Sequence, residues 1–256
     1  MKNALIGLLL SFQFFTTIPL SKSFHMTPKS ITAMYYMMPV LGLLMGFTLV
    51  LLNEINLDYL QVSPLLFSIL VVIAGIVMTG GLHLDGWIDM GDAYFSYQDR
   101  ARRLEILEDS RIGAFGAIFL VVLLLLKIGL IYEALHRFSF SINFYFMAIP
   151  FLSRLALLIY FLTMNPAKEK GLATYFKEKV IPKEVWSSLA IYTVMFCCAA
   201  YFFVGLAGIF LFGCMLFFVI LYRKWTIKNF GGMSGDLVGA LYEGTEVFLW
   251  GMLLFI

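Results

Sequence analysis

The stretch SSLAIYTVMFCCAAYFFVGLAGIFLFGCMLFFVILY at residues 187–222 contains no charged side chain. A helix crosses the hydrocarbon core of a bilayer with roughly 20 mostly apolar residues, so this stretch is too long for one span. Gly205 and Gly208 lie near its middle. A tight turn there would divide the stretch into two short spans, because a turn must lie outside the apolar core. This stretch predicts a helical membrane protein.

The composition of the whole chain agrees with that prediction. Of 256 residues, 61% are hydrophobic and only 13% are charged, with a mean hydropathy of +0.91. Soluble domains are nearer a quarter charged. These values exclude an ordinary soluble enzyme, a disordered chain and a nucleic-acid-binding protein, and the net charge of +2 indicates no particular partner. Cys197, Cys198 and Cys214 have no metal-ligand spacing, so we interpret them as small apolar residues.

Other apolar runs are long enough to span. A shorter run at 4–20 contains Ser11, Gln13, Thr16 and Thr17, and whether it spans, re-enters or lies at the interface is left open. We see no internal repeat and no linker. The sequence therefore predicts an all-α, polytopic integral membrane helical bundle of seven or eight helices, with residues 1–256 forming one catalytic domain. The further predicted spans are 31–52, 64–80, 113–135, 142–163 and 237–256.

The basic residues predict the orientation of these spans. Four alternate connections hold 14 of the 18 lysines and arginines, whereas the intervening connections hold only Arg137. Cytoplasmic loops carry such an excess of positive charge. We therefore expect a multi-pass protein of the cell membrane with its charged connections in the cytoplasm and its C-terminus outside. These connections are 21–30, 81–112, 164–186 and 223–236, and they hold 25 of the 34 charged residues.

The connection that follows the run 64–80 begins GGLHLDGWIDMGDAYFS, residues 80–96. Asp85, Asp89 and Asp92 are four and three residues apart, which places them on one face of a helix, with His83 pointing away from them. Three like charges repel each other without a cation, and oxygen ligands alone favour Mg²⁺ or Mn²⁺ over zinc. Carboxylate-bound Mg²⁺ beside arginines suits a pyrophosphate. A solvated loop whose charges merely balance is the alternative. The arginines that follow are Arg100, Arg102, Arg103 and Arg111.

A second group of candidates lies in NFGGMSGDLVGALYEGTE, residues 229–246. Glycines recur every fourth residue at 231, 235 and 239, which predicts close helix packing. Asp236 is expected in the first turn of the last helix, where it could act only as a cap. Glu243 and Glu246 lie inside an apolar run, where ionisable groups are functional candidates. Pairing with Arg154 or Lys127 is the structural alternative. The lysine-rich segment 165–184 suits anionic lipid as well as it suits a substrate.

These stretches resemble one known family. GGLHLDGWIDMGDAYFS, EDSRIGAFGAI and GGMSGDLVGALYE are similar to three characteristic stretches of cobalamin-5′-phosphate synthase, also called adenosylcobinamide-GDP ribazoletransferase. FFTTIPL, MPVLGLLMG, LSR and KGLATYF extend the resemblance over nearly the whole chain. The resemblance implies a Mg²⁺-dependent membrane enzyme that joins α-ribazole or α-ribazole 5′-phosphate to adenosylcobinamide-GDP and releases GMP. Membrane lipid is the other expected partner, and the number of subunits is left open.

The spacing of the acids and the expected reaction together yield candidate roles. A carboxylate of the acidic group, not singled out, would accept the proton of the attacking hydroxyl. The candidate catalytic residues are Asp85, Asp89, Asp92 and Asp109, and the candidate metal ligands are Asp85, Asp89, Asp92 and Asp236. The candidate substrate contacts are His83, Arg100, Arg103, Ser110, Arg111, Gly235, Asp236 and Glu243.

Two other functions compete with this hypothesis. A CDP-alcohol phosphotransferase also uses aspartates and Mg²⁺ at a membrane face, but its DGxxAR pattern is absent, since Gly86 is followed by Trp87 and does not lead to Ala-Arg. A cation-coupled transporter would place its acids near the midplane and show repeats, neither of which this chain predicts.

Overall fold

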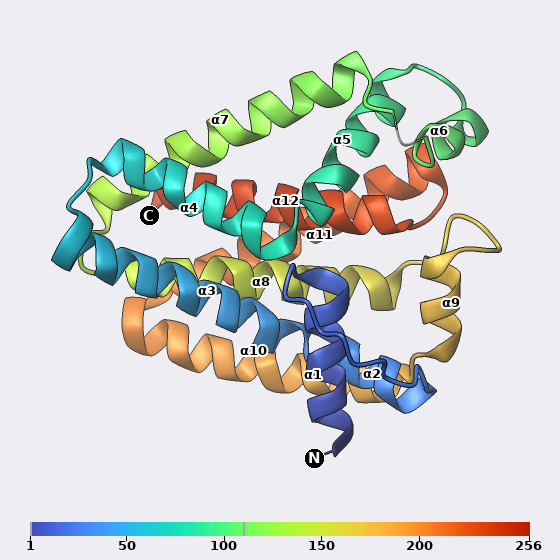
Figure 1. Cartoon of the computed structure of the whole chain (residues 1–256), viewed down its shortest axis with the longest axis horizontal. Helices are drawn as coiled ribbons and strands as arrows, with labels where there is room; N and C mark the ends of the chain where they lie inside the picture. Colours follow the sequence, from blue (N-terminus) through green and yellow to red (C-terminus); the bar gives the residue numbers. More distant parts are fainter. Residues whose placement is uncertain (1, 110) are drawn as a thin grey trace.

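The computed structural model describes residues 2–109 and 111–256, and within them the helices, joined by loops, are the only regular elements (Figure 1). Short π-helical and 3₁₀ turns extend two of the helices at Asn56–Leu60 and Leu253–Phe255. The α-helices are α1 (Lys2–Phe15), α2 (Pro28–Tyr36), α3 (Met38–Ile55), α4 (Pro64–Thr79), α5 (Leu82–Phe95), α6 (Arg100–Ile106), α7 (Ala114–Arg137), α8 (Ile142–Thr163), α9 (Leu172–Lys179), α10 (Pro182–Val204), α11 (Leu206–Phe230) and α12 (Gly235–Met252). The predicted all-α membrane bundle is confirmed.

Six of the described helices are long and apolar enough to cross a bilayer: α3, α7, α8, α10, α11 and α12. A seventh span results if α4 and α5, which meet at 95°, are counted as one broken span. The run at 4–20 forms only the short helix α1, and the run at 31–52 is divided at Met37 into α2 and α3. The turn predicted in 187–222 occurs at Gly205, while Gly208 lies within α11 against Ala200.

The helix α8 forms the centre of the bundle, because 78% of its apolar 18-residue stretch is buried inside the protein. It packs closely on α3, because a Cβ on Gly42 would lie 2.8 Å from the carbonyl oxygen of Pro150, and one on Gly46 would lie 2.6 Å from the Cα of Met147. In α7 and α10 only 22% and 17% of the corresponding 18-residue stretch is buried. Exposed apolar side chains on these outer helices suit contact with lipid.

The charged connections gather at one end of the bundle. Figure 1 shows one group of elements toward the right: the start of α2, α5, α6, α9 and the α11–α12 connection. The opposite end carries the α3–α4, α7–α8 and α10–α11 connections. This arrangement agrees with the alternation predicted from the lysines and arginines. The end that carries α5, α6 and α9 is the end at which the functional candidates lie.

Candidate functional site

Helix α5 carries the three aspartates and starts from a sharp bend. Gly80 and Gly81 both adopt left-handed backbone conformations, with φ of +65° and +75°, which favour glycine because it has no Cβ. The bend turns the chain by 95° out of α4, so that α5 does not continue the direction of α4. Asp85, Asp89 and Asp92 follow at helical offsets on one side of α5, as predicted.

Helix α12 packs on α5 through two glycines. A Cβ on Gly86 would lie 2.8 Å from the Cα of Asp236, and a Cβ on Gly239 would lie 3.2 Å from the Cα of His83. This close approach brings Asp236, in the first turn of α12, beside the aspartates of α5. Of the glycines predicted to pack helices at four-residue intervals, only Gly239 does so. Gly231 ends α11 with φ of +83°, and Gly235 faces open space.

Asp92 connects α5 with the start of α7. Its two carboxylate oxygens accept the backbone N–H groups of Gly113 at 2.7 Å and Gly116 at 2.8 Å. Glycine is required at both positions, because a Cβ on either residue would collide with this carboxylate. A carboxylate at a helix N-terminus is stabilised by the unpaired N–H groups and by the helix dipole. The segment RIGAFG therefore holds α7 on α5, and Asp92 has a structural task.

The acids of this end of the bundle act on one another through their charges. Burial raises the pKa of Asp89 to about 7, and the negative charges of Asp85, Asp236, Asp92 and Asp109 add to that effect in this order. Like charges at short range disfavour ionisation, and a cation among them would relieve the repulsion. Asp85 is exposed, while Asp89 and Asp236 are half-buried.

The aspartate and arginine of the DSRIG stretch pair with each other on the surface. Nη2 and Nε of Arg111 lie 2.6 Å and 2.9 Å from the carboxylate oxygens of Asp109. Hydrogen bonds from Arg111 hold the pKa of Asp109 down to about 2. The Arg111 side chain is 87% exposed, so its guanidinium is accessible from solvent. Ser110, also a predicted substrate contact, lies outside the described residues.

The two other predicted arginines contact the end of α11. Arg100 donates to the carbonyls of Ile227 at 3.2 Å and Lys228 at 3.4 Å, where it satisfies the free carbonyls of the helix C-terminus. Arg103 donates to the Asn229 side chain at 2.8 Å. These contacts attach α6 to α11, whereas neither arginine forms a salt bridge with the aspartates of α5 among the described residues.

Two loops that come from distant parts of the chain are joined beside Asp236. The backbone N–H of Met233 donates to Asn165, and that of Ala167 donates to Met233, both at 2.9 Å. The Ser234 hydroxyl caps α12 by accepting the N–H of Leu237, so the cap is Ser234 rather than Asp236. The joined loops place the predicted lysine-rich segment at the same end as the acids.

Two cavities meet at these joined loops. One of ≈ 240 Å³, here called the aromatic chamber, and one of ≈ 210 Å³, here called the basic pocket, share Leu172, Ala173 and residues 233–236 as lining. The basic pocket takes its name from Lys168 and Lys170 in its lining, and Glu108 and Asp236 also line it, so its formal charges balance. The aromatic chamber is lined by Phe14, Phe15, Tyr35, Phe161, Phe176, His83, Asp85, Ser234, Gly235 and Asp236, among others. The structure thus brings together four predicted residues, His83, Asp85, Gly235 and Asp236.

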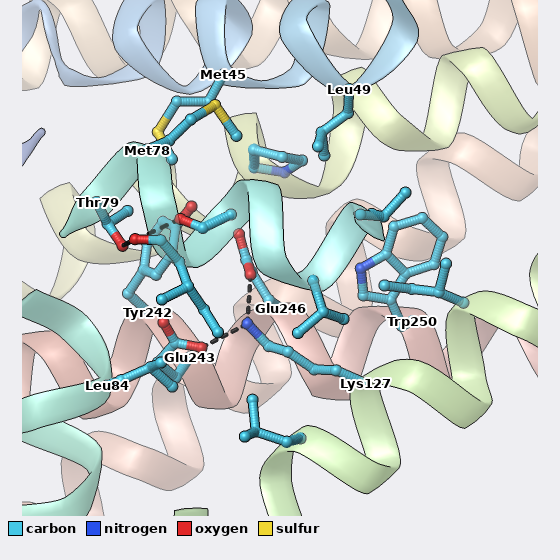
Figure 2. Close-up of a pocket in the computed structure, with 17 residues that line it drawn as sticks. Met45, Leu49, Met78, Thr79, Leu84, Lys127, Tyr242, Glu243, Glu246 and Trp250 are labelled. Atoms are coloured by element: carbon cyan, nitrogen blue, oxygen red, sulfur yellow. Dashed lines mark hydrogen bonds and ion pairs between the residues drawn. The ribbon is translucent and has the colours of Figure 1, made fainter. Parts of the chain in front are cut away.

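Glu243 lies apart from this group, about 10 Å further along α12 than Asp236. Figure 2 shows the Lys127 ammonium between the carboxylates of Glu243 and Glu246, which line an enclosed cavity of ≈ 40 Å³. Lys127 donates to Glu243 and, at 2.7 Å, to Glu246. Of the two predicted structural partners, Lys127 is therefore the one that pairs. Arg154 is instead stacked over the ring of Tyr242, with 4.4 Å from its guanidinium carbon to the ring centroid.

The described residues contain no group of three His, Cys, Asp or Glu side chains already positioned to hold a metal ion. Mg²⁺ is commonly bound by one or two carboxylates together with substrate phosphates, so a complete protein cage is not required. Asp85 and Asp89 have no hydrogen-bond partner for their carboxylates among the described residues, whereas both oxygens of Asp92 are occupied by N–H groups. The oxygen donor set and its mutual repulsion fit a hard divalent cation at Asp85 and Asp89.

Comparison with known proteins identifies the family of the chain. A family described as cobalamin-5-phosphate synthase matches residues 7–254. The adenosylcobinamide-GDP ribazoletransferase of Geobacillus sp. (strain WCH70) is 35% identical over 99% of this chain and 97% of its own length, and that of Clostridium botulinum (strain Alaska E43 / Type E3) is 33% identical over the full length of both. This chain belongs to the cobalamin-5-phosphate synthase family. No solved structure matches it.

Membership of the cobalamin-5-phosphate synthase family makes the chain a transferase of cobalamin biosynthesis. It favours the first of the three sequence hypotheses over the CDP-alcohol phosphotransferase and the transporter. The synthase stretches that carried the resemblance converge in space: LHLDG and SGDLVG pack on each other, and DSRIG leads into the α7 start on Asp92.

Sequence reasoning did not single out Lys168 or the aromatic residues of the two cavities. Lys168 forms an ion pair with Glu108 at 2.6 Å, and both line the basic pocket of the synthase. Phe15, Tyr35 and Phe161 come from three helices that are distant in the sequence. The stretches FFTTIPL and KGLATYF contained a signal, because both lie at the chamber and both were noted only as part of the resemblance.

Proposed function

We propose that this enzyme joins α-ribazole or α-ribazole 5′-phosphate to adenosylcobinamide-GDP, with release of GMP, in a Mg²⁺-dependent reaction. The observation that carries the proposal is that Asp85 and Asp236 line the aromatic chamber, while Asp236 also lines the adjoining basic pocket. Asp89 lies on the same side of α5 as Asp85 and is affected by the charges of both residues. The names of the similar proteins suggest the substrates, and the neighbouring apolar chamber, lysines and carboxylates support this proposal.

Asp85 and Asp89 would hold the Mg²⁺, with Asp236 as a further carboxylate beside them. The cation would supply neutralisation of the charge that develops on the pyrophosphate oxygens. Asp92 would orient the metal-binding face, because it fixes α5 to α7 through two backbone N–H groups. The negative charge of Asp109 adds to the raised pKa of Asp89, and its carboxylate accepts hydrogen bonds from Arg111.

The reaction forms one bond and breaks one bond at phosphorus. A ribose hydroxyl attacks the cobinamide-linked phosphorus, the phosphoanhydride bond breaks, and GMP leaves with the electron pair of that bond. A carboxylate of the acidic group accepts the hydroxyl proton. Lys168 and Lys170 line the basic pocket, and the accessible Arg111 lies on the same end of the bundle, so these cations suit the departing phosphate.

We infer that the active face is cytoplasmic and that the protein resides in the cell membrane. The connections gathered at this end of the bundle hold most of the lysines and arginines, which is the bias of cytoplasmic loops. Cysteine labelling from outside intact cells tests this inference. A cysteine placed at Gln98, in the α5–α6 connection, should resist a membrane-impermeant reagent, whereas one placed at Phe140, between α7 and α8, should react.

GMP release by the purified protein tests the activity. With Mg²⁺, adenosylcobinamide-GDP and α-ribazole, release should depend on every component, and EDTA should abolish it. Replacing the substrates by CDP-diacylglycerol and an alcohol should give no CMP. Asp85→Ala should lower kcat at least about a hundredfold in a folded, membrane-inserted protein. Normal turnover of purified Asp85→Ala would refute the metal assignment, and CMP release would refute the substrate assignment.

A further inference from the structure

The aromatic chamber has the lining expected of a pocket for a flat ring. Its ≈ 240 Å³ is far above the space of about 10–15 Å³ that a single water needs, and its walls are mainly apolar and aromatic. Phe161 and Tyr35 stack with their centroids 4.0 Å apart, and Phe176 meets Tyr35 edge-on at 71°. Rings stacked in this way are held rigid, and aromatic partners prefer offset or edge contacts with them.

One buried polar side chain of the chamber lining has an unpaired nitrogen. His83 lines the chamber and is 2% exposed, and its Nε2 has no hydrogen bond among the described residues. The imidazole packs against two aromatic rings, with the Tyr242 centroid at 4.4 Å and the Phe15 ring at 6.4 Å and 24° to it. A buried polar atom without a partner is costly, so the His83 imidazole suits a hydrogen bond with a ligand.

The mouth of the chamber carries the reacting groups. Asp85, Ser234 and Asp236 line it together with His83, and the basic pocket adjoins it through Ala173 and residues 233–236. A ligand with an apolar ring in the chamber would therefore present its polar end to the carboxylates.

We propose that the aromatic chamber binds the base of the nucleoside substrate, a flat bicyclic heteroaromatic ring, and that His83 hydrogen-bonds to a ring nitrogen. The inference rests on the proposed function, because that function supplies a nucleoside. It adds the place of the nucleoside relative to the acids and a determinant of base selection. The base lies among the aromatic rings, and the ribose reaches the mouth beside Asp85 and Asp236. Cobinamide-GDP then approaches from the side of the basic pocket.

A chamber-filling variant tests the position of the base. Val238→Phe adds volume at a partly buried residue that lines the chamber but not the basic pocket, and Val194→Phe makes the same change on the exposed face of α10. Val238→Phe should raise the KM for α-ribazole about tenfold or more, with the KM for adenosylcobinamide-GDP within about twofold. Val194→Phe should change neither constant. An equal rise of both constants, or no rise, would overturn the inference.

A second pair of variants tests the role of His83. His83→Phe keeps a ring on Tyr242 but removes the nitrogen, and should weaken α-ribazole binding about tenfold. His83→Gln retains a hydrogen-bonding group and should recover part of that loss. A deaza analogue of α-ribazole has a C–H group in place of the unsubstituted ring nitrogen of the base. The wild type and His83→Phe should bind this analogue equally. A His83→Phe effect that persists with this analogue would refute the hydrogen bond.

Equilibrium binding separates this inference from the proposed function. Fluorescence titration of α-ribazole into detergent-purified protein, with neither Mg²⁺ nor a second substrate, reports on the chamber alone. If the wild type releases no GMP but Val238→Phe loses α-ribazole binding, the inference stands and the proposed function fails. If the wild type releases GMP and Val238→Phe binds α-ribazole unchanged, the inference fails alone. Displacement of α-ribazole by a fatty acid but not by benzimidazole would assign the chamber to lipid.

Discussion

The backbone of Asp236 lies directly against Gly86, so that a Cβ on Gly86 would come within 2.8 Å of the Asp236 Cα. This contact joins the first turn of α12 to the helix that carries the aspartates. It also explains why two stretches separated by most of the chain belong to one site. The distance between the acids of α5 and Asp236 depends on the absence of a single methyl group.

Gly86→Ala should therefore separate α5 from α12 and lower activity sharply. The new methyl group must displace backbone, which typically costs about 1–3 kcal/mol in a well-packed interior. GMP release and the thermal unfolding midpoint in detergent should both fall. Gly129→Ala on α7 is the matched control, because a Cβ there meets nothing within 4 Å. Wild-type activity of Gly86→Ala would show that the close contact does not position Asp236.

Asp92 and Asp85 should behave differently although both belong to the same acidic face. Asp92→Asn leaves one of the two N–H groups, of Gly113 or Gly116, without an acceptor. It should lower the free energy of unfolding by about 1–3 kcal/mol, with little change in the Mg²⁺ concentration needed for half-maximal activity. Asp85→Asn, at an exposed position, should leave the unfolding midpoint unchanged and raise that Mg²⁺ concentration. If Asp92→Asn instead raised the required Mg²⁺ concentration and Asp85→Asn lowered the unfolding midpoint, Asp92 would be the metal ligand and Asp85 the structural residue.

Much of the fold followed from the sequence because membranes impose simple rules on it. Length and apolarity located the spans, the alternation of basic residues grouped the connections, and offsets of four and three placed Asp85, Asp89 and Asp92 on one side of α5. Gly205 marked a turn because the uninterrupted run could not span once. Each of these predictions depends on residues that are close in the sequence.

The parts that were missed depend on long-range contacts. The spacing of the aspartates could not show that Gly113 and Gly116 occupy Asp92, or that His83 and Asp85 line one chamber although they point to different sides of α5. The choice between Lys127 and Arg154 as partner of Glu243 was open for the same reason. Lys127 lies within reach only because α7 and α12 pack side by side.

The buried ion pairs of Lys127 with Glu243 and Glu246 should stabilise the folded protein. Removing one partner of a buried ion pair leaves an uncompensated charge, at a cost of about 3–5 kcal/mol. Lys127→Met should therefore lower the thermal unfolding midpoint far more than Arg137→Met, which removes an exposed cation from the same helix. Adding Glu243→Gln to Lys127→Met should recover part of the loss. If Glu243→Gln alone raised the KM of a substrate without altering stability, Glu243 would be a substrate contact, as first predicted.

Arg111 should matter for activity and not for stability. Its guanidinium is 87% exposed, and it pairs with Asp109 in a surface loop, where ion pairs contribute little to folding. Arg111→Gln should leave the unfolding midpoint unchanged while raising the KM for adenosylcobinamide-GDP, because the exposed side of the guanidinium that Asp109 does not occupy can donate to the pyrophosphate. Arg102→Gln is the matched control, since Arg102 is 62% exposed and pairs with Glu105 on α6. Equal effects of the two changes would mean that the end of the bundle attracts the anionic substrate by net charge alone, and only a larger effect at Arg111 supports a specific clamp.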